Sequence, residues 1–231
     1  MRLIQNLLFA LTVGAFAASP ASALPTAPKS GVEYNTLEQS LRTDTGNKVE
    51  VIEFFSYSCP HCHAFEPKLS AWLKQNADKV AFKRVHVAFH ASDAALQRMY
   101  LTLEAMGLTE QVHQKVFSAI HEQRSTRLAN DEQVFNWIEK NGIDRAKFMG
   151  VYRSFGAQSW VNRAQALVGS YKIDSWPMIA IGGRYLTSPH VASRGMPDQH
   201  QHQHQHNESE LQQNALMVMD HLVAKAKSEL K

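Results

Sequence analysis

Hydrophobic positions along the chain follow two different spacings, and the order of these spacings predicts an α/β protein. Residues 48–55 form a run of β-branched and aromatic side chains without glycine or proline, which predicts a buried strand. Phe65, Leu69 and Trp72 then recur at helical spacing, and residues 80–87 predict a second strand. The first part of the chain therefore predicts a strand–helix–strand unit.

The middle of the chain, from residue 89 to residue 168, carries helical periodicity. The predicted apolar stripes are Leu96, Met99, Tyr100 and Leu103; Val112, Val116, Phe117 and Ile120; Val134, Phe135 and Ile138; and Phe148, Val151, Tyr152 and Phe155. We expect Gly107, Gly142 and Gly156 near the ends of these helices, and a last helix over residues 159–168. This region predicts an all-helical block.

Strand character returns after the helical block. Residues 178–181 are apolar, Gly182-Gly183 predicts a tight hairpin turn, and residues 184–187 predict the return strand. The stripe that predicts a final helix is Leu211, Ala215, Val218 and Leu222. The whole pattern predicts a small α/β domain that is interrupted by a helical insertion.

The N-terminal segment predicts export. Arg2 precedes an apolar run over residues 7–18, and residues 21–23, Ala-Ser-Ala, supply the small side chains of a cleavage site. The apolar run is too short to span a membrane comfortably. We therefore expect a signal peptide over residues 1–23 and a mature chain that starts near Leu24.

Composition narrows the classes of function. The chain has 231 residues and a formal net charge of +3, which falls to +2 when Arg2 is removed with the signal peptide. A chain so close to neutral gives no indication of nucleic-acid binding or of electrostatic attachment to a membrane. Its length allows one domain with an insertion or two small domains.

The sequence contains two cysteines, Cys59 and Cys62, which are separated by two residues. Exported proteins meet an oxidising environment in which disulfides persist. A disulfide over so short a loop stabilises the fold little, because the entropic effect grows with loop length. Redox chemistry therefore explains the pair better than stability does.

The motif Cys59-Pro60-His61-Cys62 lies where a predicted strand gives way to a predicted helix. Pro60 suits the first turn of a helix, where its missing N–H costs no hydrogen bond. The free N–H groups and the dipole of the helix N-terminus favour a thiolate on Cys59, and His61 adds a donor and, when protonated, a positive charge. We expect client thiols to attack the more accessible Cys59, and Cys62 to be the leaving thiol that can also resolve a mixed disulfide.

Residues 54–62, Phe-Phe-Ser-Tyr-Ser-Cys-Pro-His-Cys, resemble the active-site segment of the DsbA family in the thioredoxin superfamily. Pro67 matches the kinking proline of the active-site helix, and residues 175–178, Ser-Trp-Pro-Met, resemble the family's cis-proline loop. The resemblance implies an α/β, thioredoxin-like fold with an inserted all-α helical domain. The implied parts are residues 24–88 and 169–231 for the thioredoxin-like domain and residues 89–168 for the insertion.

The resemblance also implies roles for three further residues. Pro177 would be cis and would pack against the disulfide, and with Trp176 it would border the groove that binds an extended client segment. Trp176 departs from the family pattern, in which this position is often smaller. Glu53 matches a buried acid beneath the cysteines and would exchange a proton with Cys62. The alternative for Glu53 is a position at a sheet edge, where its carboxylate reaches solvent.

As a member of this family, the chain would be a periplasmic protein thiol:disulfide oxidoreductase that passes the Cys59–Cys62 disulfide to newly exported, cysteine-containing proteins. A DsbB-like membrane quinone oxidoreductase would reoxidise the pair, no cofactor would be needed, and the chain would act as a monomer. The short segment before the first strand argues against an isomerase with an N-terminal dimerisation domain. A reductase is left open, because the sequence does not identify the redox partner.

One alternative concerns haem. Cys59-Pro60-His61-Cys62-His63 also satisfies the pattern for covalent attachment of c-type haem, with His63 as the proximal ligand. The strand before the motif and the packing stripe after it favour the redox disulfide instead.

Another alternative concerns metal binding by the Gln/His tract over residues 199–206. In an extended chain its histidines would lie on one side, which suits weak binding of Ni, Cu or Zn; they are His200, His202, His204 and His206. A polar loop without a function explains the same residues. On either view we expect the tract to be dispensable for redox activity.

Overall fold

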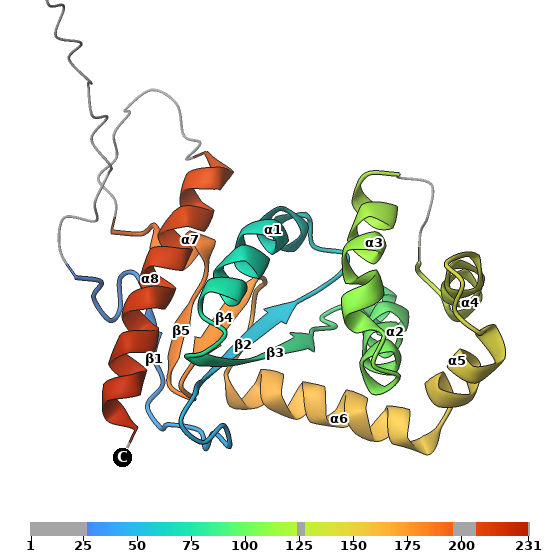
Figure 1. Ribbon diagram of the computed structural model, residues 1–231, viewed down its shortest axis with the longest axis horizontal. Coiled ribbons are helices and arrows are strands. Elements are labelled where there is room, and N and C mark those ends of the chain that lie inside the picture. Colours follow the sequence, from blue (N-terminus) through green and yellow to red (C-terminus); the bar gives the residue numbers. More distant parts are fainter. Residues whose placement is uncertain (1–26, 124–127, 196–206, 231) are drawn as a thin grey trace, which may run out of the picture.

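The computed structural model describes residues 27–123, 128–195 and 207–230. Within them a mixed β-sheet lies beside a block of helices (Figure 1). The predicted signal peptide and the Gln/His tract lie outside the described residues.

The sheet has five strands in the order β1-β5-β4-β2-β3. Their bounds are β1 (Asn35–Thr36), β2 (Val49–Phe55), β3 (Val80–His86), β4 (Met178–Ile181) and β5 (Tyr185–Thr187). β2 is parallel to β3 and antiparallel to β4, and β5 pairs antiparallel with both β4 and β1. All four strands predicted from hydrophobicity are confirmed, whereas the two-residue β1 is too short for a pattern to reveal it.

Helices cover both faces of the sheet. α1 (Pro60–Gln75) connects β2 to β3, and α8 (Glu208–Glu229) lies beside α1. Side chains of both helices join Val49 and Val51 in one core cluster. Ile52 and Phe54, which point to the opposite face because side chains alternate along a strand, pack against the end of α6 and the short helix α7.

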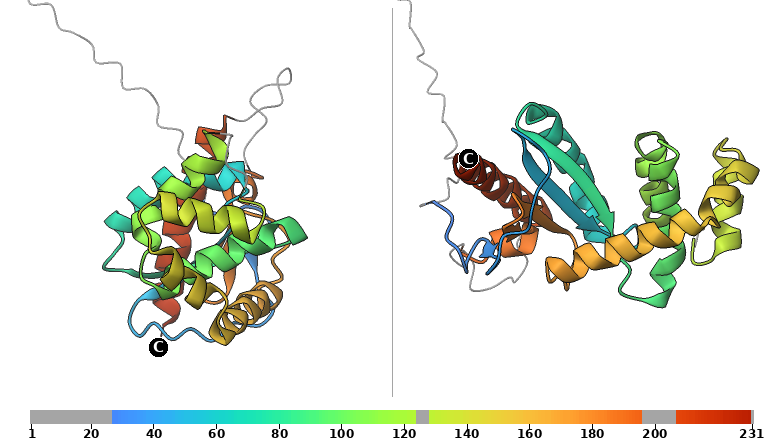
Figure 2. Two further views of the ribbon diagram at one scale, coloured as in Figure 1. Left: turned by 90° about the vertical axis from the view of Figure 1, so that its right-hand side faces the viewer. Right: turned by 90° about the horizontal axis from the view of Figure 1, so that it is seen from below.

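The helical block follows β3. Its elements are the 3-10 helix η1 (Ala91–Asp93) and the helices α2 (Ala94–Ala105), α3 (Thr109–His121), α4 (Asp131–Lys140), α5 (Arg145–Tyr152) and α6 (Phe155–Ser170). Figure 2 shows α6 extending from this block toward the sheet. Val161 packs in the core of the block, whereas Ala164 packs under the sheet. The thioredoxin-like fold with a helical insertion is confirmed, and the domain boundaries at residues 88 and 168 stay predictions.

One predicted apolar stripe, Phe148 to Phe155, is wrong at its last residue. Phe155 does not continue the apolar face of α5, because that helix ends at Tyr152 and the side chain of Phe155 is 90% exposed. The hydroxyl of Ser154 accepts a hydrogen bond from the N–H of Ala157 at 3.1 Å and so caps a new helix. α6 therefore begins at Phe155 rather than near residue 159. Gly156 lies near a helix end as expected, in the first turn of α6.

The C-terminal part follows the predicted order with one addition. Gly182 and Gly183 have φ angles of +60° and +67°, as the predicted hairpin turn requires. A helix of four residues, α7 (Pro189–Ala192), follows β5 and was not predicted. In α8 the predicted stripe is buried except at Leu211, which is half-buried. None of the helices in the described part of the chain is long and apolar enough to span a membrane.

Candidate active site

The two cysteines form a disulfide at the N-terminus of α1. Cys59 is the N-cap residue of the helix, and Pro60 occupies the first turn as predicted. The N–H of Cys62 donates to Sγ of Cys59 at 3.0 Å, so a free backbone donor of the helix end points at this sulfur. Cys59 is 1% exposed and Cys62 is 0% exposed, which makes the predicted difference in accessibility small.

The loop before β4 lies against the disulfide. The Trp176–Pro177 peptide bond is cis, which confirms the conformation implied by the family resemblance. The carbonyl oxygen of Trp176 lies 4.0 Å from Sγ of Cys59. Two segments that are more than a hundred residues apart in sequence therefore meet at the reactive sulfur.

His61 lies on the exposed side of the motif. Its side chain is 70% exposed, and Nδ1 lies 2.9 Å from Oε1 of Glu208 at the start of α8. Among the described residues no hydrogen bond joins His61 to either cysteine sulfur. The imidazole therefore faces a carboxylate and solvent rather than the disulfide.

A cleft of about 880 Å³ opens beside the cis-proline loop. It lies between this loop and the first turns of α7 and α8. Its lining includes His61, Trp176, Pro177, His190, Arg194 and Leu211. The cleft thus places polar and apolar side chains within reach of a chain bound at Cys59.

Three histidines hold Tyr57, which lies two residues before Cys59. Nε2 of His86 accepts the N–H of Tyr57 at 3.1 Å, and Nε2 of His121 donates to the Tyr57 carbonyl at 2.9 Å. The Tyr57 hydroxyl lies 2.9 Å from Nδ1 of His113. We refer to these three side chains as the histidine cradle. They come from β3 and from α3, so the cradle ties the active-site segment to the helical block.

Burial raises the pKa of the Tyr57 phenol and lowers that of His86 to about 3. Burial also lowers the pKa of His113 and of His121. These three histidines share no regular spacing in the sequence. Only the fold brings them to one residue.

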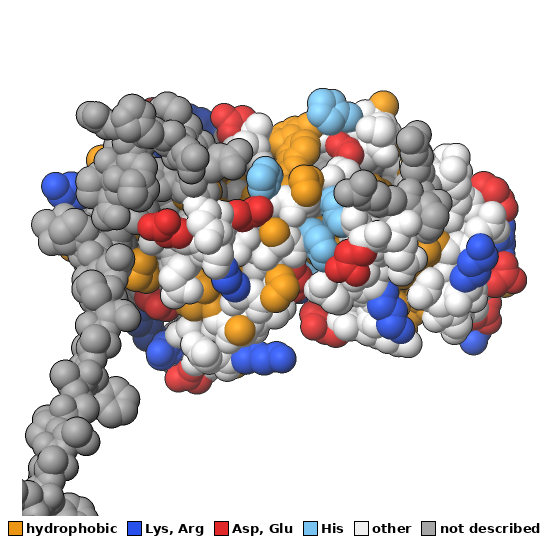
Figure 3. All heavy atoms as spheres, turned by 90° about the horizontal axis from the view of Figure 1, so that it is seen from above, with side chains coloured by type: hydrophobic (Ala, Val, Ile, Leu, Met, Phe, Trp, Pro, Cys, Tyr) orange, Lys and Arg blue, Asp and Glu red, His pale blue; other side chains and the backbone are white. Residues whose placement is uncertain are grey.

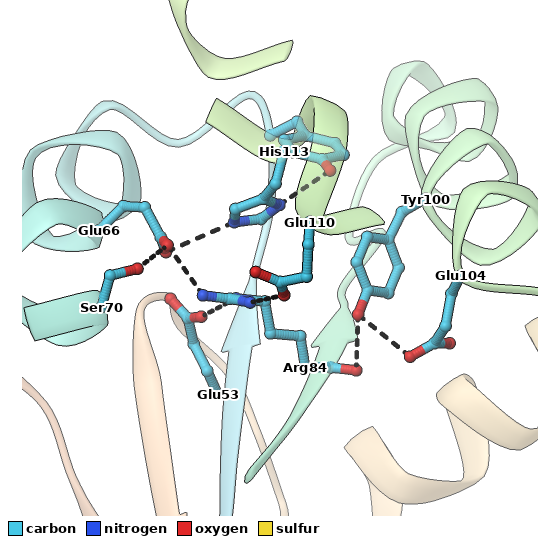
Figure 4. Close-up of polar contacts among 9 residues, drawn as sticks. Glu53, Glu66, Ser70, Arg84, Tyr100, Glu104, Glu110 and His113 are labelled. Carbon is cyan, nitrogen blue, oxygen red and sulfur yellow. Dashed lines mark hydrogen bonds and ion pairs between the residues drawn. The ribbon is translucent and has the colours of Figure 1, made fainter. Parts of the chain in front are cut away.

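Glu53 is buried on the central strand β2, on the face that α1 covers. The predicted burial is confirmed, and the alternative of an edge position is wrong because β3 and β4 flank β2. Oε2 of Glu53 accepts from Nε of Arg84 at 3.0 Å, as Figure 4 shows. Its other oxygen, Oε1, has no hydrogen-bond partner among the described residues.

Arg84 also binds a second buried carboxylate. Its Nη2 donates to Oε1 of Glu66 at 2.8 Å, and Ser70 donates to the same oxygen at 2.6 Å. Nε2 of His113 lies 3.4 Å from the other oxygen of Glu66. One guanidinium thus lies between two buried carboxyl groups (Figure 4).

The two carboxyl groups differ in acidity. Burial raises the pKa of Glu53 to about 8, although the charge of Arg84 opposes the shift. Burial acts in the same direction on Glu66, but His113, Arg84 and Ser70 outweigh it and hold its pKa below the ordinary value. Near neutral pH, Glu66 therefore carries the negative charge that balances Arg84, and Glu53 retains its proton. The sequence predicted a role for Glu53. No pattern in it indicated that Arg84 and Glu66 would lie beside that carboxyl group.

His63, the proximal ligand in the haem hypothesis, is half-buried between α1 and α3. Its ring stacks on His121 with centroids 5.1 Å apart, and Nε2 lies 3.3 Å from Oε1 of Glu122. Within the described ranges, no three His, Cys, Asp or Glu side chains are grouped so that they could hold a metal ion. The four tract histidines lie outside those ranges.

Comparison with known proteins agrees with the site. A family model described as Thioredoxin matches residues 41–194. The thiol:disulfide interchange protein DsbA of Bordetella parapertussis is 41% identical over 182 residues, which cover 79% of this chain and 86% of that protein. The DsbA of Azotobacter vinelandii is 33% identical over 221 residues, which cover 96% and 92%.

Solved structures show the same likeness. The crystal structure of Pseudomonas aeruginosa DsbA aligns with a TM-score of 0.74 and 29% identity, and the alignment covers 86% of this chain and 94% of that one. The oxidoreductase DsbA from Xylella fastidiosa shares the fold with a TM-score of 0.74 at 24% identity, over 88% and 100% of the two chains.

Proposed function

The chain belongs to the DsbA family of thiol:disulfide interchange proteins and is a thiol:disulfide oxidoreductase, and we propose that it works in the periplasm as a dithiol oxidase. It donates the Cys59–Cys62 disulfide to newly exported proteins. The observation that carries the proposal is the position of Cys59 as N-cap of α1, where the Cys62 N–H points at its sulfur.

The exchange takes place in two steps. A client thiolate attacks Sγ of Cys59, the bond between the two cysteine sulfurs breaks, and its electron pair leaves on Cys62. A second client thiolate then attacks the client sulfur of the mixed disulfide, and Cys59 leaves as a thiolate. The client dithiol loses two electrons and the cysteine pair gains them.

The helix end supports the second step. The N–H of Cys62 and the dipole of α1 stabilise negative charge on Cys59, which makes Cys59 a good leaving group. His61 adds positive charge at the rim when it is protonated, and Glu208 holds its ring. The relatives that the chain matches are named thiol:disulfide interchange proteins, which favours disulfide exchange over covalent haem attachment at Cys59 and Cys62.

Glu53 exchanges the proton of Cys62 in this proposal. Reduction leaves Cys62 as a buried thiolate, which requires a proton. Glu53 is buried on the strand face beneath α1, burial raises its pKa to about 8, and one of its oxygens has no partner among the described residues. A carboxyl group that retains its proton near neutral pH suits this role.

Clients bind along the cis-proline loop. Trp176 and Pro177 line the cleft, and the carbonyl oxygen of Trp176 lies 4.0 Å from Sγ of Cys59. An extended client segment would pair with the backbone of this loop, because sheet edges bind peptides in this way. A DsbB-like membrane quinone oxidoreductase reoxidises the pair, and the protein acts as a monomer after cleavage near Leu24.

Two substitutions test the assignment of the cysteines. Cys59→Ser should abolish oxidation of a reduced, unfolded client. In Cys62→Ser, the Cys59 thiolate should attack the disulfide of an oxidised client, release one client thiolate and stay joined to the client as a mixed disulfide, because the resolving thiol is absent. Mass spectrometry of the trapped complexes identifies the linked cysteine, and absence of any trapped client would contradict the roles proposed here.

The reduction potential separates an oxidase from a reductase. Equilibration of the Cys59–Cys62 pair with glutathione buffers measures it. We expect a potential well above that of thioredoxin, which is about −270 mV. A value near that of thioredoxin would indicate a reductase instead.

The Gln/His tract is proposed to bind metal weakly and to take no part in exchange. Deletion of residues 199–206 should leave the rate of client oxidation unchanged and should remove nickel binding measured by titration. A large loss of oxidase activity would show that the tract contributes to the reaction.

A further inference from the structure

A carboxylate from the C-terminal helix holds the histidine of the redox motif. Nδ1 of His61 lies 2.9 Å from Oε1 of Glu208, in the first turn of α8, although the two residues are 147 positions apart in sequence. The side chain of His61 is 70% exposed and that of Glu208 is 46% exposed. A contact so open to solvent stabilises a fold little. An effect on the adjacent cysteine pair therefore explains it better than stability does.

The start of α8 is anchored on α1, which places Glu208 beside the motif. Nζ of Lys68, on α1, donates to the hydroxyl and the carbonyl oxygen of Ser209 and to Oε1 of Gln212, at 2.6, 3.1 and 2.9 Å. Figure 3 shows acidic and histidine side chains close together on the face where both helices begin. The contact between Glu208 and His61 is therefore built into the packing of α8 on α1.

No other charged group of the neighbouring cleft competes for the His61 ring. Asp174, His190 and Arg194 also line this cleft, but within the described ranges none of them makes a hydrogen bond or an ion pair with His61. Glu208 is therefore the group that decides which way the imidazole points.

The orientation of His61 affects the thiolate of Cys59. A protonated imidazole stabilises a neighbouring thiolate most when its N–H points at the sulfur. Here Nδ1 is turned toward Glu208, and in the described part of the chain no hydrogen bond joins the ring to either cysteine sulfur. The carboxylate also offsets the positive charge that the ring carries when it is protonated. Both effects reduce the help that His61 gives to the thiolate.

We propose that Glu208 is a positioning residue that holds the His61 ring away from Cys59 and so makes the Cys59–Cys62 disulfide a weaker oxidant. The inference rests on the proposed function and adds to it a residue that lies outside the redox motif. A less stabilised thiolate is a poorer leaving group, and it makes the reduced pair less favoured. Removal of the Glu208 carboxylate frees the ring to donate to the sulfur of Cys59.

Equilibration with glutathione tests the proposal in the full-length protein. Two glutathione thiols lose two electrons and one proton each and join as a disulfide. The cysteine pair takes up the two electrons, Cys62 takes up one proton, Cys59 stays a thiolate, and the other proton goes to solvent. We expect the equilibrium constant for this reduction to be about 2- to 5-fold larger in Glu208→Ala than in the parent, which is the range for a contact between exposed charged groups.

Ionisation of the reduced protein gives a second readout. Titration by thiolate absorbance should show a lower pKa of the Cys59 thiol in Glu208→Ala than in the parent, because a freed imidazolium stabilises the thiolate. A merely structural role of Glu208 would lower the free energy of unfolding of the oxidised and the reduced protein alike. It would leave the glutathione equilibrium and this pKa unchanged, and that result would overturn the proposal.

Two further variants show whether Glu208 acts through His61. Glu210→Ala is the matched control and should behave as the parent, because Glu210 is exposed in the same turn and its side chain has no partner among the described residues. In a His61→Ser background, Glu208→Ala should shift the glutathione equilibrium much less, because no ring is left to position. A shift as large as in the parent background would show that Glu208 acts on the sulfur without His61, and it would also overturn the proposal.

The failures of the two proposals are distinguishable. The oxidase function depends on the potential of the parent protein, whereas the role of Glu208 depends on the difference between the parent and Glu208→Ala. If the parent has a potential well above that of thioredoxin and the variant matches it, the role of Glu208 fails and the oxidase function stands. If the parent itself has a potential near that of thioredoxin, the proposed function fails.

Discussion

The hydroxyl of Tyr57 lies 2.9 Å from Nδ1 of His113, and both side chains are buried. This contact joins the segment before Cys59 to α3 of the helical block. A second contact is the stacking of the His63 ring, from α1, on the His121 ring, from α3. The active site is therefore built at the junction of the sheet domain and its insertion.

The Tyr57–His113 contact predicts a loss of stability in Tyr57→Phe. Removing the hydroxyl deletes a buried hydrogen bond and leaves Nδ1 of His113 without it, which costs about 1–3 kcal/mol. Urea denaturation at neutral pH measures the free energy of unfolding. Tyr171→Phe is the control, because its hydroxyl makes a longer contact of 3.4 Å with Glu50 and should lose less. Equal stability of Tyr57→Phe and the parent would contradict the prediction.

The lowered pKa of His86 predicts that the folded protein loses stability in acid. Burial lowers its pKa to about 3, whereas the unfolded chain takes up this proton near the ordinary value of 6.5. Between these two pH values the unfolded state binds more protons, so the free energy of unfolding falls as the pH falls, by about 1.4 kcal/mol per pH unit for this group.

The substitution His86→Gln removes that proton and keeps an acceptor for the N–H of Tyr57. We expect the stability of this variant to fall less steeply below pH 6.5, as measured by denaturation at a series of pH values. His90→Gln changes an exposed histidine and serves as the control. Parallel curves for parent and His86→Gln would show that His86 does not titrate as described.

The raised pKa of Glu53 predicts that the free energy of unfolding falls as the pH rises from 5 to 8. Burial raises its pKa from 4.5 to about 8, although Arg84 opposes the shift. Between these values the folded state binds the extra proton, so this group lowers stability as the pH rises. Glu53→Gln should become more stable relative to the parent from pH 5 to pH 8. Glu50→Gln, on the same strand, controls for the amide itself, and a difference that does not grow with pH would refute the assignment.

The sequence predicted the redox motif because its chemistry is local. A strand, an N-cap position and the first turn of a helix follow one another directly at Cys59 and Pro60, so hydrophobic spacing was enough to place them. The hairpin at Gly182 and Gly183 was predictable for the same reason, since two adjacent residues determine the turn.

Contacts between residues that are far apart in the sequence could not be predicted from hydrophobic spacing. The histidine cradle joins Tyr57 to residues that lie 29, 56 and 64 positions away, and Arg84 binds Glu53 and Glu66 from a different strand. Phe155 was misassigned because its helical spacing from Tyr152 continued an apolar stripe. The cap at Ser154, a single hydrogen bond, decided where the new helix began.

The hairpin turn yields the last prediction. Gly183 has a φ of +67°, and a Cβ at this position would overlap the carbonyl oxygen of Leu41. Gly183→Ala should therefore lower the free energy of unfolding by about 2–4 kcal/mol, because the left-handed conformation and the overlap both cost energy. Gly150→Ala is the matched control: Gly150 lies exposed in α5 with nothing within 4 Å of a new Cβ, and alanine there should raise stability by up to about 1 kcal/mol. If urea denaturation gives the two variants the same stability, then Leu41 does not pack on the turn as described.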